Sequence, residues 1–197
     1  MHCQIVLYDS FDPLDVVGPF EVLAAADASL ELVSVSGIRP VVSGTRNLVL
    51  TATGPLDPDR PGYVVVPGVS GPLDEIPQRL TRFDGAALLA AALANPAVTV
   101  ATVCGGALAL AMAGLIKGRH AVTHVQGMPA LEATGVHAVP ARVVDDGDLI
   151  SSGGVTSGLD LGLYLVEREF GASAALAVEQ LFQYERRGVV WKKTGEQ

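Results

Sequence analysis

The chain has 197 residues and a formal net charge of −8, with 49% hydrophobic and 17% charged residues. This composition is typical of a globular protein and excludes a disordered chain. Basic residues form no cluster longer than Arg186-Arg187 or Lys192-Lys193, which argues against nucleic acid as a partner. The length suits one domain with a substantial core, and we expect residues 1–197 to form a single domain.

Apolar runs of strand length alternate along the chain with loops and alanine-rich segments of helix length. In the first half, the pattern predicts a strand at 4–9, a turn and helix at 16–27, a strand at 30–37, a short hairpin from 40–44 and 48–54, and a strand at 63–68. In the second half, it predicts a helix at 82–95, a strand at 98–103, a helix at 105–116, a hairpin at 139–154, and helices at 157–171 and 173–185. Continuous apolar strands separated by helices predict an α/β fold, with a mostly parallel sheet sandwiched by helices.

Residues 97–116 carry no charge, and their length is that of a membrane-spanning helix. A single helix is disfavoured because 98–103 is rich in β-branched residues, and because Gly105 and Gly106 would each cost about 1 kcal/mol in a helix interior. We therefore expect a buried strand, a turn and a buried helix, and no membrane segment. The start "MHCQIVLYD" resembles no signal peptide.

Two cysteines, Cys3 and Cys104, make no disulfide framework, so a reducing cytoplasm is the expected location. Four scattered histidines without Cys-x-x-Cys or His-x-x-x-His spacing do not support a metal site. Cys3 has no special setting and is interpreted as a packing residue at the start of the first strand.

Cys104 lies at the junction of a predicted strand and helix, with Gly105 and Gly106 behind it. A strand that turns abruptly into a helix places this residue at the carboxyl edge of the sheet, where ligands bind in parallel α/β folds. Glycines relieve the crowding of such a nucleophile elbow. The helix N-terminus is expected to favour the thiolate, and the free N–H groups there could bind a developing anion. The alternative is a small, buried, unreactive cysteine.

A cysteine nucleophile needs a partner that moves protons, and the loop after the first strand offers Asp12, Asp15 and Glu21. Asp15 lies between apolar neighbours, where a carboxyl group has a raised pKa and can share a proton with sulfur. An equally good local interpretation makes Asp15 the N-cap of the following helix. The loop after the strand at 63–68, with Gly68, Val69 and Ser70, is expected at the same sheet edge.

Three segments, "YVVVPGVSG", "VTVATVCGGALALAMAGLIKGRHAVTH" and "ARVVDDGDLISSGGVTSGLDLGLYLVE", resemble the ThiJ/PfpI superfamily and, within it, the isonitrile hydratase group. The resemblance covers about residues 4–185, and it implies a flavodoxin-like fold of the class I glutamine amidotransferase type. Carried over, it assigns the nucleophile to Cys104, the essential acid to Asp15, and a backbone anion site to Gly68, Val69 and Gly105.

The resemblance also implies the addition of water to a small isonitrile through a Cys104 thioimidate, no cofactor or metal, and a homodimer. Three positions depart from the hydratase pattern: Gly105 replaces a threonine, Val69 a glycine, and Val125 a tryptophan. Ser70 and His124 are candidate pocket residues, although a structural role for His124 is the stronger interpretation. Two alternatives stay open: a glyoxalase or deglycase acting on 2-oxoaldehydes, and a non-enzymatic sensor domain related to the amino-terminal domains of AraC-type regulators.

Overall fold

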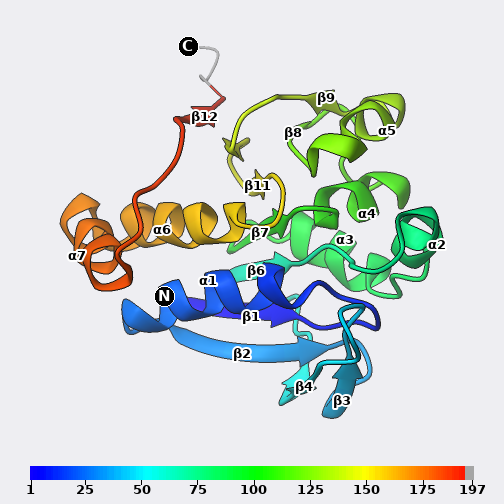
Figure 1. Ribbon diagram of the computed structural model, residues 1–197, viewed down its shortest axis with the longest axis horizontal. Helices are drawn as coiled ribbons and strands as arrows, with labels where there is room; N and C mark the ends of the chain where they lie inside the picture. Colours follow the sequence, from blue (N-terminus) through cyan, green and yellow to red (C-terminus); the bar gives the residue numbers. More distant parts are fainter. Residues whose placement is uncertain (194–197) are drawn as a thin grey trace.

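A computed structural model describes residues 1–193 and confirms the predicted α/β fold class. One eight-stranded sheet runs through the middle of the molecule (Figure 1). Its strands, in spatial order, are β12 (Val190–Lys192), β10 (Val143–Asp145), β11 (Leu149–Ser152), β7 (Val98–Val103), β6 (Gly62–Val66), β1 (His2–Val6), β2 (Ser29–Ser34) and β5 (Gly54–Pro55). All neighbouring pairs are parallel except β10 with β11, which form the predicted hairpin.

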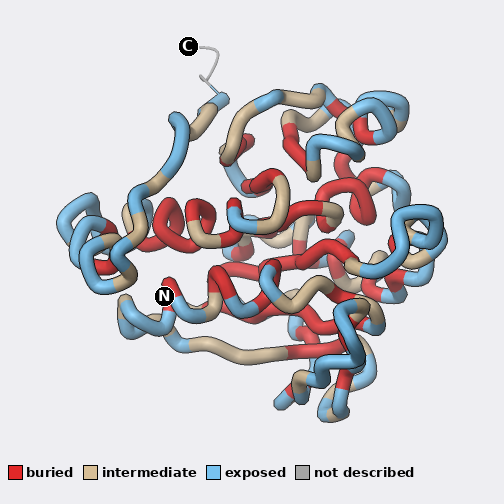
Figure 2. Tube along the Cα trace, in the orientation of Figure 1, coloured by how far each residue is buried: buried red, intermediate tan, exposed pale blue. Residues whose placement is uncertain are grey.

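Helices cover both faces of this sheet. One face carries α1 (Pro13–Ala25), α6 (Ser157–Phe170) and α7 (Ala172–Phe182); the other carries α2 (Ile76–Thr81), α3 (Ala86–Ala94), α4 (Gly106–Met112) and α5 (Met128–Ala133). Successive strand residues alternate between the two cores, so that Ile5 packs with the first group and Val6 with the second. The central strands are therefore buried along most of their length (Figure 2), which is why most of their residues are apolar.

Shorter elements lie outside the main sheet. The predicted hairpin of the first half is confirmed as β3 (Arg39–Val42) and β4 (Val49–Ala52), which pair antiparallel in a sheet of their own. β8 (His120–Ala121) and β9 (His137–Ala138) form a second small sheet, in parallel. Single 3-10 turns, η1 (Leu73–Glu75) and η2 (Val125–Gly127), precede α2 and α5.

Several predicted boundaries are wrong. The helix expected at 82–95 begins only at Ala86, and a separate helix, α2, was not predicted. The helix expected at 105–116 ends at Met112, because Gly114 adopts a left-handed conformation (φ +77°) and Leu115 N–H donates back to Leu110 O at 3.0 Å. The first helix starts at Pro13 rather than 16, which brings Asp15 into its first turn.

In the order β2-β1-β6-β7-β11, strands β2 and β6 lie on opposite sides of β1, and this reversal of direction is a switch point of the kind beside which α/β proteins bind ligands. The carboxyl ends of β1, β6 and β7 lie side by side there, and the segments carrying Asp15, Gly68 and Cys104 follow these three strands. Residues 97–116 include β7, a turn and α4, as predicted. None of the helices within residues 1–193 combines the length and hydropathy needed to cross a membrane.

Candidate active site

Cys104 occupies a strained turn between β7 and α4. Its φ is +54°, a left-handed conformation that residues other than glycine rarely adopt. Neighbouring segments hold this conformation: Cys104 N–H donates to the carbonyls of Ser152 and Gly153, each at 3.0 Å, and Thr123 Oγ1 donates to Cys104 O at 2.7 Å. Strain fixed by several hydrogen bonds is a mark of functional positions, and it supports the predicted nucleophile elbow.

The two glycines that follow Cys104 differ in how closely other atoms surround them. A Cβ on Gly106 would lie 2.3 Å from Val66 O, so the start of α4 can approach β6 only with glycine at that position. A Cβ on Gly105 would lie 3.3 Å from Leu80 Cδ2, a tight contact with a flexible side chain. The fold therefore requires glycine at position 106. At position 105 it does not, and glycine there leaves room for the Leu80 side chain.

Asp15 is fully buried in the first turn of α1. Its Oδ2 accepts a hydrogen bond from Gly68 N–H at 2.9 Å, and its Oδ1 accepts none from residues 1–193. The N-cap of α1 is Asp12, whose Oδ1 accepts from Leu14 N–H at 2.9 Å, so the interpretation of Asp15 as the helix cap is wrong. A buried carboxyl oxygen without a protein partner is available for chemistry.

The Asp15 carboxyl and the Cys104 thiol form an interacting pair. Burial raises the pKa of Asp15 well above its ordinary value, and the charge of Asp12 raises it further, while the hydrogen bond from Gly68 N–H and the neighbouring Cys104 thiol oppose this shift. Burial likewise raises the pKa of Cys104, and the negative charge of Asp15 adds to the rise. The pair therefore resists carrying two negative charges, and a proton can pass between sulfur and oxygen.

The structure does not support a lowered resting pKa for Cys104. Burial and the negative charge of Asp15 outweigh the neighbouring Gly105 N–H, which by itself lowers the thiol pKa as expected at a helix start. The helix behind the elbow has only seven residues, which limits its dipole. Ionisation of Cys104 thus requires transfer of its proton, for which Asp15 is the adjacent acceptor.

The loop after β6 contributes backbone N–H groups at the same edge. Gly68 N–H is already engaged by Asp15, so Gly68 positions the acid instead of binding an anion as expected. Val69 N–H donates no hydrogen bond to any of residues 1–193, and it lies 3.8 Å from the position of a Cβ on Gly105. Val69 and Gly105 therefore remain the candidates for stabilising a developing negative charge.

A cavity of about 530 Å³ opens beside Cys104, and we call it the Cys104 cavity. The predicted pocket residues Ser70 and His124 both line it, together with Val69 and Gly105. His124 also has the expected structural role, because its Nδ1 accepts from Gln126 N–H at 3.3 Å at the start of η2. Most of the apolar lining comes from α2, α4 and the segment before α2, with Leu73, Ile76, Leu80, Leu108 and Met112, and Val155 before α6 adds to it.

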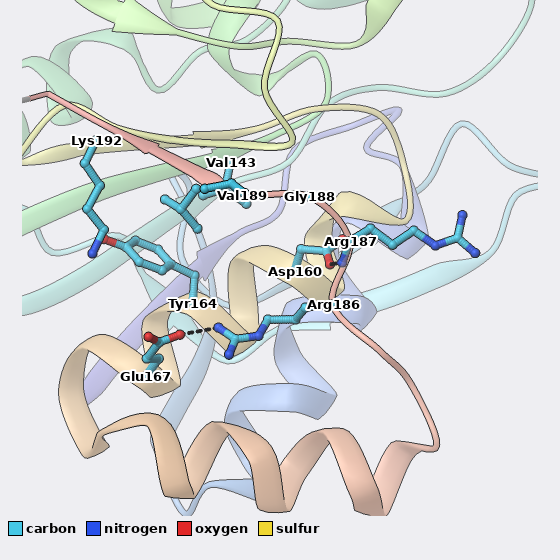
Figure 3. A pocket seen from close by; sticks show the side chains of 10 residues that line it. Val143, Asp160, Tyr164, Glu167, Arg186, Arg187, Gly188, Val189 and Lys192 are labelled. Atoms are coloured by element: carbon cyan, nitrogen blue, oxygen red, sulfur yellow. Dashed lines mark hydrogen bonds and ion pairs between the residues drawn. The ribbon is translucent and has the colours of Figure 1, made fainter.

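A second cavity, of about 380 Å³, lies between α6 and the C-terminal segment (Figure 3). Its acids are paired, Glu167 with Arg186 and Asp160 with Arg142. No cysteine, serine or histidine is among the described residues that line it. The Cys104 cavity is therefore the candidate active site. Within residues 1–193, no three His, Cys, Asp or Glu side chains converge as a metal site requires.

Three contributors to the site were not predicted. Tyr8 is buried, and its hydroxyl donates to Pro67 O at 2.7 Å, which holds the loop that carries Gly68. Thr123 fixes the elbow, and the Thr-His pair in the sequence was the available signal for it. Leu80 had no signal, because the helix that carries it was not predicted.

Cys104 should react with iodoacetamide at neutral pH well before Cys3. Cys104 lines the cavity, whereas Cys3 is fully buried and burial raises its pKa to about 12. Peptide mass spectrometry after limited alkylation measures the order, and complete labelling of both thiols in denaturant is the control. Because the pKa of Cys104 is raised, its rate should climb with pH. Equal labelling of the two thiols would contradict the assigned accessibility.

A cysteine on a left-handed turn from strand to helix, next to a buried carboxyl group, defines an α/β protein with a nucleophile elbow. The chain belongs to the DJ-1/PfpI family, whose model matches residues 1–168.

Known proteins with similar sequences or structures agree with this assignment. The chain is 34% identical over 182 residues to an isonitrile hydratase of Pseudomonas putida, covering 91% of this chain and 76% of that protein. It is 26% identical over 155 residues to a deglycase of Pyrococcus abyssi, covering 77% and 89%. A crystal structure of a ThiJ/PfpI family protein from Pseudomonas syringae superimposes with a TM-score of 0.81 at 27% identity, covering 94% and 76%.

Proposed function

We propose that this protein is an isonitrile hydratase, which adds water to R–N≡C and releases the formamide R–NH–CHO. The observation that carries the proposal is the buried Asp15 carboxyl, with one oxygen free of protein partners, paired with the thiol of an elbow cysteine. The 34% identity to the isonitrile hydratase of Pseudomonas putida supports the same reaction class.

The first half of the reaction forms a covalent intermediate. The reactive form of the pair carries a single proton, on the sulfur: the Asp15 carboxylate takes this thiol proton while Sγ of Cys104 attacks the terminal isonitrile carbon. The same proton then passes to that carbon and gives the thioimidate R–N=CH–S–Cys104. A carboxyl group whose pKa is raised by burial suits both roles, because its carboxylate is a stronger base than an ordinary one and its acid form can return the proton.

The second half uses water. Asp15 takes a proton from the attacking water, which adds to the thioimidate carbon, and the nitrogen becomes protonated. The intermediate R–NH–CH(OH)–S–Cys104 then collapses: the C–S bond breaks, the hydroxyl proton leaves, and the sulfur regains its proton. The Val69 and Gly105 N–H groups are available to donate hydrogen bonds to negative charge that develops on the oxygen. None of these reaction steps uses a cofactor.

A second candidate is aldehyde chemistry of the deglycase type, and the similarity to the Pyrococcus abyssi deglycase favours it. The same thiol and acid could add to the carbonyl carbon of a 2-oxoaldehyde. Against this candidate, the residue after the cysteine is Gly105 rather than a histidine that could move protons beside the sulfur.

The direct test is an assay of purified protein with an aliphatic isonitrile and, in parallel, with methylglyoxal. We expect formamide from the isonitrile, measured by NMR, at a rate well above that with buffer alone. Consumption of methylglyoxal without formamide would instead favour the deglycase reaction. Turnover of neither substrate would favour the sensor interpretation.

We further propose that the protein forms a homodimer in a reducing cytoplasm. The β3–β4 hairpin exposes a group of apolar side chains that the fold leaves uncovered: Ile38 (75% exposed), Val42 (43%), Leu48 (47%) and Val49 (49%). A partner that covered this surface would remove it from water. Light scattering should give twice the chain mass, and Val49→Asp should lower it to the monomer. A monomeric wild type would contradict the proposal.

A further inference from the structure

Leu80 packs beside the nucleophile, against the position that a side chain at residue 105 would occupy. It is the one buried residue of α2, with 2% of its surface exposed, and it lines the Cys104 cavity. Its Cδ2 lies 3.3 Å from where a Cβ on Gly105 would be. In the hydratase pattern that Gly105 interrupts, a threonine stands here. In this chain the nearest side-chain atom to that position is hydrocarbon, Cδ2 of Leu80.

Helix α2, which carries Leu80, is attached to the loop after β6. Arg79, the preceding residue, donates from its guanidinium to Ser70 O at 2.9 Å and pairs with Glu75 one turn earlier. A Cβ on Gly71 would lie 2.6 Å from Arg79 Cζ, so the guanidinium rests directly on that glycine. Because α2 is tied to the loop that supports the site, Leu80 holds a defined position relative to Cys104.

The cavity is also selective by charge. Among the described residues that line it, only Asp12, Cys104 and His124 can ionise, and none is lysine or arginine. A carboxylate on a substrate would meet no permanent counter-ion and would lie near the acid of Asp12. Substrate parts other than the reacting carbon are therefore expected to be neutral.

We propose that Leu80 is the specificity-determining residue of this site, where it packs against an apolar, branched carbon attached to the isonitrile nitrogen. The inference rests on the proposed hydratase function and deepens it. In place of an orienting hydroxyl, the site positions its substrate by contact between hydrocarbon surfaces. Gly105 and Leu80 form a matched pair, because the absence of a side chain at position 105 gives Leu80 its space beside Cys104.

The test compares tert-butyl isonitrile with methyl isonitrile in wild type and in Leu80→Ala. Each methylene removed from an apolar contact costs about fourfold in binding, so we expect the kcat/KM ratio of tert-butyl to methyl substrate to fall about tenfold or more in Leu80→Ala. Leu89→Ala is the matched control: Leu89 is a fully buried leucine of the same core that does not line the cavity, and its ratio should not change. An unchanged ratio in Leu80→Ala would overturn the proposal.

A double-mutant cycle tests the pairing of the two residues. Gly105→Thr alone should lower kcat/KM about tenfold, because its side chain meets Leu80. Leu80→Ala combined with Gly105→Thr should recover most of that loss, since the space is vacated. Additive losses would contradict the pairing. If Leu80→Ala does not fold, Leu80→Val removes one methylene and should lower the substrate ratio about fourfold.

A binding assay separates this inference from the reaction itself. N-tert-butylformamide, N-methylformamide and anionic N-formylglycine are tested for protection of Cys104 against iodoacetamide. We expect protection to decrease in that order. In Leu80→Ala, the preference for N-tert-butylformamide over N-methylformamide should fall about tenfold. If this order holds and no isonitrile is hydrated, the proposed function fails and the role of Leu80 stands. If isonitriles are hydrated without any dependence on Leu80, the proposed function stands and the role of Leu80 fails.

Discussion

Replacing Cys104 by alanine is expected to lower isonitrile hydration by about 10⁴-fold or more, because the thiol forms the covalent intermediate and no second thiol of the described chain lines the cavity. Formamide production under substrate saturation measures the loss in kcat. Intact-mass spectrometry of wild type mixed with substrate and quenched in acid should show the thioimidate, and the variant should show no adduct.

The alanine variant should keep the fold, so that the loss is chemical. Alanine has the same difficulty with a φ of +54° as cysteine, and the hydrogen bonds that hold the turn use only the backbone of residue 104. Cys3→Ala is the companion variant, because Cys3 is buried away from the cavity and its loss should leave kcat unchanged. Residual activity of Cys104→Ala above about one per cent of wild type would argue for direct attack by water.

The parts of the fold that the sequence predicts well are those with strong local patterns. The strand 98–103 matches β7 residue for residue, because six apolar or β-branched residues end at a cysteine followed by two glycines. The short elements α2, β8, β9 and β12 escaped prediction since tertiary contacts rather than local periodicity hold them. Trp191 of β12, for example, stacks on His120 with ring centroids 4.9 Å apart.

The candidate site shows the same division. The elbow and the acid were identifiable from Cys104 and Asp15, but which acid caps α1 depends on where that helix starts, and Pro13 moved the start by three residues. The direction of the thiol pKa depends on burial, which a motif does not specify. The engagement of Gly68 N–H by Asp15 joins residues 53 positions apart and has no local signature.

Asp15→Asn should be the second-largest loss, about 10²- to 10⁴-fold in kcat, because general acid–base catalysis contributes about that much. Asparagine can still accept from Gly68 N–H through its amide oxygen, so the loop should keep its position. It cannot take the thiol proton, so the rate of Cys104 alkylation should change its dependence on pH. Glu21→Gln is the matched control, since Glu21 is an exposed acid on the same helix.

The same variant should make the protein more stable at neutral pH. The pKa of Asp15 is raised in the folded state. Below about pH 4 the carboxyl is protonated in both folded and unfolded chains, so its ionisation does not lower the free energy of unfolding. As the pH rises, the unfolded chain ionises while the folded state keeps its proton, so wild type loses stability relative to Asp15→Asn until the pH passes the folded pKa. Thermal unfolding from pH 4 to 8 should show a Tm difference that widens with pH. Equal Tm values throughout would mean that burial does not raise the pKa of Asp15 in the folded state, and they would contradict the assigned environment of this carboxyl group.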